Sequence, residues 1–239
     1  MLFKITSLNL QSMSPVRGLS LQIMLPIERI RSEISADVFD YTHLVSALSS
    51  YSNPRKVITS LLRKGQILRI KKGLYIFSPL WRRKPVNKKY IANIIYGPSA
   101  VSLDYALSWH GLIPERVTQI TSVTTGRSRK YQTPLGRFSY TRVPQTLFNS
   151  GLNIYRSDDT VWLMSLPVAS LVCKAWTDKR FRPASPGSYN SYLFDDLRIN
   201  EETLLRYYRE EKLEIAENMV PRKIKWLYIF LEKKFNSVL

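Results

Sequence analysis

The sequence predicts an α+β protein, in which a helical unit ending in a basic β-hairpin precedes a mixed α/β region with a small sheet and C-terminal helices. Two patterns predict this class. Apolar residues first recur at three- and four-residue steps and then alternate, and later segments mix both spacings. A chain of 239 residues with 44% hydrophobic content is long enough for two domains. We expect a variable arm over 1–27, the helical unit over 28–90 and the mixed region over 91–239.

The positive charge of the chain lies mostly in one segment. The formal net charge is +18, yet no acidic residue occurs between Asp40 and Asp104, where the 63 intervening positions carry twelve lysines and arginines. Like charges held this close repel one another, and such an imbalance usually indicates a polyanionic partner that offsets the repulsion. Nucleic acid is the first candidate.

The first two helices are expected from apolar spacing. Residues 1–27 show no periodicity, which suits a loosely attached arm. From Glu28 onward a helix is expected, because one face would gather apolar residues at three- and four-residue steps. These residues are Ile27, Ile30, Ile34 and Val38. A second helix is expected over 42–50, with Leu44, Val45 and Leu48 turned inward.

The third helix has a defined start and end. Asn53 suits the N-cap, and Pro54 suits the first helical position because its missing N–H would have no intrahelical partner there. Gly65 ends the helix. The buried face is expected to carry Val57, Ile58, Leu61 and Leu62, and the opposite face carries Arg55, Lys56, Thr59, Ser60 and Arg63.

A basic hairpin follows the third helix. Residues 66–77 alternate Ile67, Arg69 and Lys71 against Leu68 and Ile70, turn at Lys72-Gly73 and resume as an apolar strand. Three helices and a basic hairpin, in this order, are typical of a winged helix-turn-helix. In that arrangement the third helix enters the major groove and the hairpin lies along the backbone.

The expected DNA-binding residues come from the third helix, the hairpin and the basic linker after it. They are Asn53, Arg55, Lys56, Thr59, Ser60, Arg63, Lys64, Arg69, Lys71, Lys72, Arg82, Arg83 and Lys84. Side chains near the start of the third helix would reach base edges, whereas lysines and arginines of the hairpin would hold phosphates without reading sequence. A solvated basic face on an ordinary small domain is the alternative.

The remaining elements follow from the same signals. A helix is expected from Asn87 through Ile95, and another from Ser102 to Gly111. Strands are expected within 118–125, 130–133 and 136–143, and a strand pair within 152–165 turns at Asp158-Asp159. A helix over 166–178 precedes a Pro/Ser/Gly loop, and the last two helices are expected over 199–219 and 221–235.

Two segments carry a resemblance to a known family. SLDYALSWHGLIPE (102–115) followed by ITSVTTGRSRKYQTPLGRFSYTRV (120–143) resembles the AbiEi family of antitoxin transcriptional regulators. VWLMSLPVASLVCKAW (161–176) is similar to the family's strand and following helix, although Leu166-Pro167-Val168 stands where many members have Thr-Pro-Glu. The RIKKGLYIF hairpin also looks like the family's N-terminal half, so the resemblance spans residues 35–180.

The resemblance implies a function and partners. It implies a winged helix-turn-helix joined to a C-terminal antitoxin domain, in a type IV toxin-antitoxin system of the kind that acts in phage defence. The protein would bind inverted repeats in its own promoter, repress its operon and counteract a nucleotidyltransferase-like toxin encoded next to it. It would be cytoplasmic, with no cofactor and no membrane partner.

A second basic group lies later in the chain. In GRSRKY, Arg127 and Arg129 alternate onto one face, Lys130 adjoins them and Tyr131 could stack beside them. These residues suit a second phosphate contact, a contact with the toxin or a solvated hairpin tip. The C-terminal segment carries the densest acids, which repel DNA and favour a protein partner or solubility. They are Glu201, Glu202, Glu210, Glu211, Glu214 and Glu217.

The sequence offers no catalytic or metal-binding constellation. His43 and His110 stand alone, and the pairs Asp158-Asp159 and Asp195-Asp196 suit turns or caps, because strand neighbours point to opposite faces. The only cysteine, Cys173, lies in an apolar stretch. We therefore expect no catalytic residue, no metal and no cofactor.

Two other functions compete with the antitoxin hypothesis. One is a winged-helix transcriptional regulator without a toxin partner, which gene neighbourhood would distinguish. The other is a divergent metal-dependent nuclease that uses Asp158 or Asp195 with Lys174, which would show as Mg²⁺-dependent cleavage.

Overall fold

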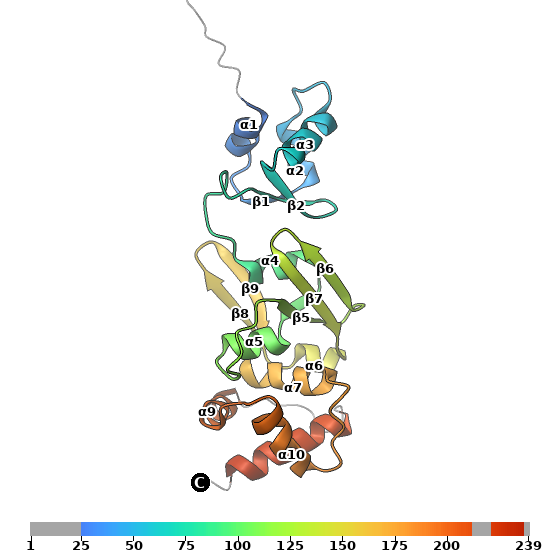
Figure 1. Cartoon of the computed structure of the whole chain (residues 1–239), viewed down its shortest axis with the longest axis vertical. Coiled ribbons are helices and arrows are strands. Elements are labelled where there is room, and N and C mark those ends of the chain that lie inside the picture. The colour runs from blue at the N-terminus through green and yellow to red at the C-terminus, as the bar shows by residue number, and fades with distance from the viewer. Residues whose placement is uncertain (1–24, 212–220, 237–239) are drawn as a thin grey trace, which may run out of the picture.

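Two β-sheets organise the fold, which extends along one long axis (Figure 1). A computed structural model describes residues 25–211 and 221–236 of the chain. In these ranges a three-stranded sheet has the order β1-β3-β2, and a mixed six-stranded sheet has the order β6-β7-β5-β4-β9-β8. The α+β class is confirmed, and the second sheet is larger than the small sheet expected. Residues 1–24 of the predicted arm lie outside the described residues.

The N-terminal unit contains three helices and the smaller sheet. Its elements are α1 (Pro26–Glu33), β1 (Val38–Asp40), α2 (Tyr41–Ala47), α3 (Pro54–Arg63), β2 (Ile67–Lys71) and β3 (Leu74–Phe77). Ile27 and Ile30 are fully buried, so the first helix begins inside the stretch expected to be an arm. Their neighbours in this core include Leu44, Leu48, Ile58, Leu61 and Phe77.

The prediction that Val38 continues the first helix is wrong. The α1 helix ends at Glu33, where the Arg31 guanidinium donates to the carbonyl oxygens of Ile34 at 2.6 Å and Ser35 at 2.5 Å. These bonds satisfy carbonyl groups that a helix end otherwise leaves unpaired. Val38 instead opens β1 and pairs antiparallel with Ile76 of β3.

Local signals set the start of α3 as predicted. The Asn53 side chain accepts a hydrogen bond from the backbone N–H of Lys56 at 3.1 Å, and Pro54 occupies the first helical position. The β2–β3 hairpin turns at Lys72-Gly73, where Gly73 has φ +83°, a conformation that glycine adopts without strain. These predictions are confirmed.

One irregularity breaks the expected alternation of the hairpin. The pairing of β2 with β3 shifts between Arg69 and Lys71. Ile70 is buried, at 4% exposure, and packs with residues of the six-stranded sheet and of α4 (Lys88–Ile95). Because Ile76 joins the same cluster, the N-terminal unit and the larger sheet share apolar contacts.

Helices cover both faces of the six-stranded sheet. Its strands are β4 (Ser99–Val101), β5 (Ile120–Thr124), β6 (Arg129–Thr133), β7 (Gly136–Arg142), β8 (Leu152–Ser157) and β9 (Thr160–Ser165). The pairs β4–β9 and β5–β7 are parallel, and the others are antiparallel. One face packs against α4, and α5 (Leu103–Trp109) and α7 (Pro167–Thr177) cover the other. The domain boundary expected at residue 90 falls inside α4.

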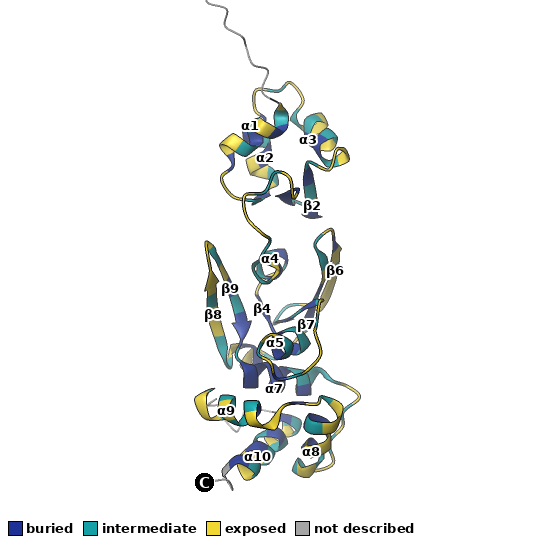
Figure 2. Cartoon of the chain, turned by 60° about the vertical axis from the view of Figure 1, so that its left-hand side comes forward, coloured by how far each residue is buried: buried dark blue, intermediate teal, exposed yellow. Residues whose placement is uncertain are grey.

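The C-terminal helices complete the second core. Short helical pieces, Pro186–Ser188, α8 (Tyr189–Ser191) and Tyr192–Asp196, lead to α9 (Glu201–Glu211) and α10 (Arg222–Asn236). Figure 2 shows α10 with a buried stripe, which comprises Ile224, Leu227, Leu231 and Phe235. Both final helices are confirmed within the described ranges, whereas Glu214 and Glu217 lie outside them. The short elements β1, β4, α6 (Gln145–Asn149) and α8 were not predicted.

Candidate nucleic-acid interface

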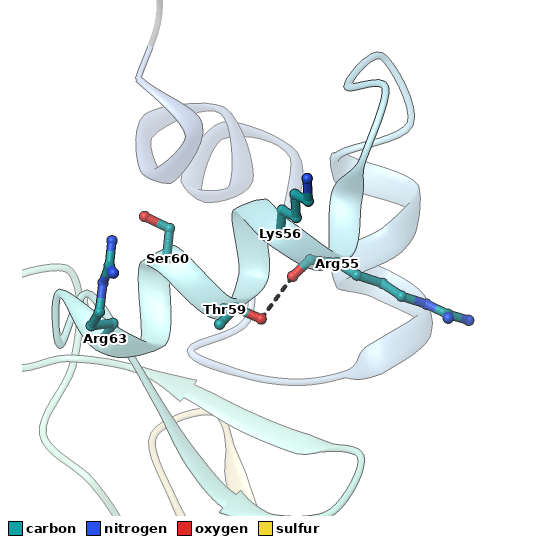
Figure 3. Close-up of a pocket in the computed structure, with 5 residues that line it drawn as sticks. All are labelled: Arg55, Lys56, Thr59, Ser60 and Arg63. Carbon is teal, nitrogen blue, oxygen red and sulfur yellow. Dashed lines mark hydrogen bonds between the residues drawn. The ribbon is translucent and has the colours of Figure 1, made fainter.

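The exposed face of α3 gathers the polar residues that its sequence spacing predicts. Ile58 and Leu61 are 5% and 3% exposed and fix the buried side of the helix. On the outer side a shallow hollow of about 300 Å³ is lined by five residues, Arg55, Lys56, Thr59, Ser60 and Arg63. In Figure 3 the side chains of Lys56, Ser60 and Arg63 point to one side of the helix, and Arg55 extends away from its first turn.

Two polar groups of this face are used within α3. The hydroxyl of Thr59 donates to the carbonyl oxygen of Arg55 at 2.9 Å, as the dashed line in Figure 3 marks. Asn53 accepts from the backbone N–H of Lys56, so its side-chain oxygen serves the N-cap. Its amide group is exposed with the helix start. Thr59 retains acceptor capacity, because a hydroxyl that donates one bond still has two lone pairs.

The cations on the exposed face of α3 have no carboxylate partner among the described residues. Every ion pair that the described residues form involves other side chains. Arg55, Lys56 and Arg63 are exposed, and Lys64 extends the group at the end of the helix. Since no described acid pairs with these charges, the face carries a positive potential that attracts phosphate.

The hairpin carries two exposed cations. Arg69 is exposed on β2, and Lys72 is exposed at the turn. Lys71 is different, because its ammonium group donates to the carbonyl oxygen of Ile95 at 2.5 Å, at the end of α4. A cation there also interacts favourably with the helix dipole. Lys71 therefore joins the hairpin to the larger sheet and does not lie with Arg69.

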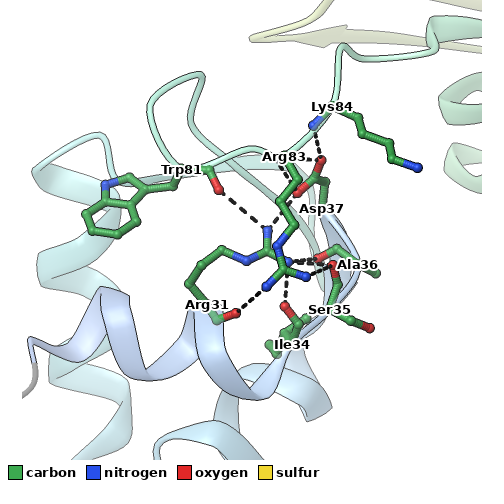
Figure 4. A network of polar contacts seen from close by, with 8 residues as sticks. All are labelled: Arg31, Ile34, Ser35, Ala36, Asp37, Trp81, Arg83 and Lys84. Atoms are coloured by element: carbon green, nitrogen blue, oxygen red, sulfur yellow. Dashed lines mark hydrogen bonds and ion pairs between the residues drawn. The ribbon is translucent and has the colours of Figure 1, made fainter.

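The linker cations also bind partners within the chain, as Figure 4 shows. The Asp37 carboxylate accepts from Arg31 at 2.6 Å and from the backbone N–H groups of Arg83 and Lys84 at 3.1 and 3.0 Å. The Arg83 guanidinium donates to carbonyl oxygens of Ser35 and Arg31. The ammonium of Lys84 pairs with Asp159 in the β8–β9 turn. Arg83 and Lys84 are thus held at the junction between the two sheets, next to Arg82 and apart from α3.

The second basic group lies at an edge of the six-stranded sheet. Arg127 is in the turn before β6, and Arg129 and Lys130 are exposed on β6 itself. Arg129 shares a face with Tyr131, as predicted, but the Tyr131 ring packs against Tyr140 with ring centroids 5.7 Å apart. That contact ties Tyr131 to the core, so these cations form a basic edge without a free aromatic ring.

The residues weighed for catalysis have separate surroundings. The ring of His110 lies 3.1 Å from the carbonyl oxygen of Ser165, and burial lowers the pKa of the imidazole. Lys174 pairs with Asp104 at 2.6 Å, and not with Asp158 or Asp195. Asp158 adopts φ +49° in the turn between β8 and β9. Among residues 25–211 and 221–236, no three His, Cys, Asp or Glu side chains cluster in a way that could hold a metal ion.

Two polar contacts have no signal in the sequence. One is the Arg31–Asp37 pair at the junction. The other is Glu211, whose carboxylate accepts from the backbone N–H of Val168 at 2.9 Å, at the start of α7. Burial raises the pKa of Glu211 to about 7. Arg31 and Asp37 are six positions apart, but their contact depends on the chain turning back after α1, whereas Glu211 and Val168 are 43 positions apart. Neither contact follows from helix or strand spacing.

Comparisons with known proteins leave the family open. No protein-family model matches the chain. No curated protein matches it either. Within the described ranges, every helix is too short or too polar to cross a lipid bilayer.

Proposed function

We propose that the chain binds double-stranded DNA with α3 and the β2–β3 hairpin, as a winged helix-turn-helix does. The observation that carries the proposal is the outer face of α3, where five polar or cationic side chains surround one hollow and the cations have no carboxylate partner among the described residues. The element order supports it, since three helices precede an antiparallel hairpin.

The dimensions of α3 suit the major groove. Its ten residues give a length of about 15 Å, and the groove is about 12 Å wide, which admits a helix. With α3 in the groove, Arg55 and Lys56 in its first turn would contact base edges. Arg63, Arg69 and Lys72 would contact phosphates on either side. Arg83 and Lys84, together with Lys71, are left out of this surface because their side chains have intramolecular partners.

The resemblance of residues 102–143 to AbiEi antitoxins supports a more specific role. The protein would repress its own operon from inverted repeats in the promoter and counteract a nucleotidyltransferase-like toxin encoded beside it. This role would place it in the cytoplasm. The acidic helix α9, with Glu201, Glu202 and Glu210 exposed, suits a protein partner better than DNA.

The test compares the protein's own upstream DNA with a scrambled duplex of equal length at about 150 mM salt, because non-specific binding weakens steeply with salt. We expect the upstream duplex to bind at least about a thousand-fold more tightly. Equal affinity for the two duplexes would contradict repression. Co-expression with the neighbouring reading frame separates an antitoxin from a regulator without a toxin, since only an antitoxin restores growth.

A further inference from the structure

The connection between the two sheets forms a cavity that DNA binding does not use. This junction cavity has a volume of about 430 Å³. Its walls come from the loop after α1, the linker 82–87, the first turns of α4 and the β8–β9 turn. The cavity therefore touches both the N-terminal unit and the six-stranded sheet, and its volume lies within the range of small-molecule sites.

The junction cavity has an apolar floor. Ile76 and Ile91 are almost fully buried, and Val38, Val86 and the ring of Tyr90 are half-buried around them. Side chains of this kind bind the hydrocarbon part of a ligand, because burying apolar surface is favourable.

The rim of the cavity is polar, and its charge balance is positive. The Asp37 carboxylate already has hydrogen-bond partners, since its oxygens accept from Arg31 and from two backbone N–H groups. Among the described residues, the Arg83 guanidinium donates only to carbonyl oxygens and forms no ion pair with a carboxylate. The Arg82 side chain forms no hydrogen bond or ion pair with another residue in the described ranges.

The remaining ion pair on the rim is weak. The side chains of Lys84 and Asp159 are 54% and 80% exposed, and pairs this exposed contribute little to stability. A ligand anion could therefore bind Lys84 in place of Asp159 at small cost. The rim thus selects an anionic group above an apolar floor.

We propose that the junction cavity binds a small amphipathic anion, a carboxylate or sulfonate with an apolar body, and that its occupancy changes DNA affinity. The proposed ligand binding depends only on the cavity, whereas the proposed coupling between ligand and DNA also depends on the proposed function. A ligand that contacts Arg82 and Arg83 on one side and the β8–β9 turn on the other favours one placement of α3 relative to the sheet. By linkage, DNA then changes ligand affinity by the same factor.

The binding test uses 8-anilinonaphthalene-1-sulfonate, an aromatic anion that fluoresces when it leaves water. The full-length protein is titrated, and octanoate and 1-octanol are compared as competitors. We expect octanoate to displace the probe at concentrations where octanol does not. Equal displacement by both would overturn the anionic preference.

Two variants test whether the probe binds in the junction cavity. Val86→Trp fills the apolar floor and should abolish the component of binding that octanoate displaces. Arg82→Glu leaves the space open but reverses one charge, and should weaken that component about five-fold or more. The matched controls are Ile229→Trp, at an exposed apolar position on α10, and Arg116→Glu, at an exposed position before β5. Unchanged probe binding in Arg82→Glu, which removes no hydrogen bond or ion pair formed by the described residues, would overturn the site.

The coupling is tested separately with operator DNA. We expect saturating octanoate to change the dissociation constant of the wild-type protein for DNA about three-fold or more and to leave that of Val86→Trp unchanged. Probe binding together with an unaltered DNA dissociation constant would overturn the coupling. If the protein binds no DNA, the probe titration still tests ligand binding in the cavity. A failure of the proposed DNA binding is therefore distinguishable from a failure of the proposed ligand site.

Discussion

The substitution Asp37→Asn tests how the N-terminal unit is attached to the rest of the chain. Asp37 receives one guanidinium and two backbone N–H groups, from Arg31, Arg83 and Lys84. Arg31 also lies over the Phe77 ring, 4.2 Å from its centroid. An asparagine keeps one acceptor oxygen, but it loses the charge and turns an NH₂ donor toward other donors.

The expected loss follows from burial. The side chains of Arg31 and Asp37 are 11% and 18% exposed, so the pair is largely removed from water. Breaking a buried pair costs about 3–5 kcal/mol, and the oxygen that asparagine retains reduces the loss. We expect a decrease of about 3 kcal/mol in the free energy of unfolding. For a chain of this size, that lowers Tm by roughly 6–12 °C.

The assay is thermal and urea unfolding followed by circular dichroism. The matched control is Asp159→Asn, because the Lys84–Asp159 pair is exposed and its loss should cost less than about 0.5 kcal/mol. If both variants unfold at the same urea concentration as the wild type, the Arg31–Asp37 contact does not stabilise the junction.

Three further predictions concern individual contacts. Lys71→Met should destabilise the fold by about 1–3 kcal/mol in urea unfolding, because the carbonyl of Ile95 loses its charged donor, whereas Lys72→Met should leave stability unchanged. Lys72→Ala should weaken binding to all DNA sequences alike and lower the slope of the logarithm of the binding constant against log salt by about one. Weaker binding to one sequence only would refute the phosphate contact. Glu211 has its pKa raised by burial to about 7, so the folded state holds its proton more tightly than the unfolded state. Its contribution to stability is therefore lost as pH rises from about 5 through 7, and Glu211→Gln should flatten stability against pH in this window; an unchanged profile would contradict it.

Local signals account for what could be predicted of α3. Asn53, Pro54 and Gly65 mark its ends, and the spacing of Ile58 and Leu61 fixes which side is buried. Each signal acts over a few residues, so the sequence alone reveals the outer face of the helix. The same holds for the hairpin turn at Gly73.

Long-range contacts account for what could not be predicted. The three-residue strand β4 exists because β5 and β9 flank it, and its own residues carry too short a pattern. The linker cations looked equivalent in sequence, yet the Arg83 guanidinium donates to Ser35, 48 positions away, and the Lys84 ammonium pairs with Asp159, 75 positions away. Lys71 does not lie on the same side of the hairpin as Arg69, because the pairing of β2 with β3 shifts between these two residues. The alternation of side chains in the sequence does not predict this shift.

Chemical protection of guanines shows whether α3 lies in the major groove. Methylation at N7 reads the major groove, so a helix seated there shields guanines within the operator. We expect the wild-type protein to protect guanine N7 at its upstream site, and Arg55→Ala to lose about 1–3 kcal/mol of binding and part of that protection. The control Lys179→Ala, at an exposed position after α7, should protect as the wild type does. Full protection by Arg55→Ala, or protein bound at the site with no guanine shielded, would contradict the placement of α3 in the major groove.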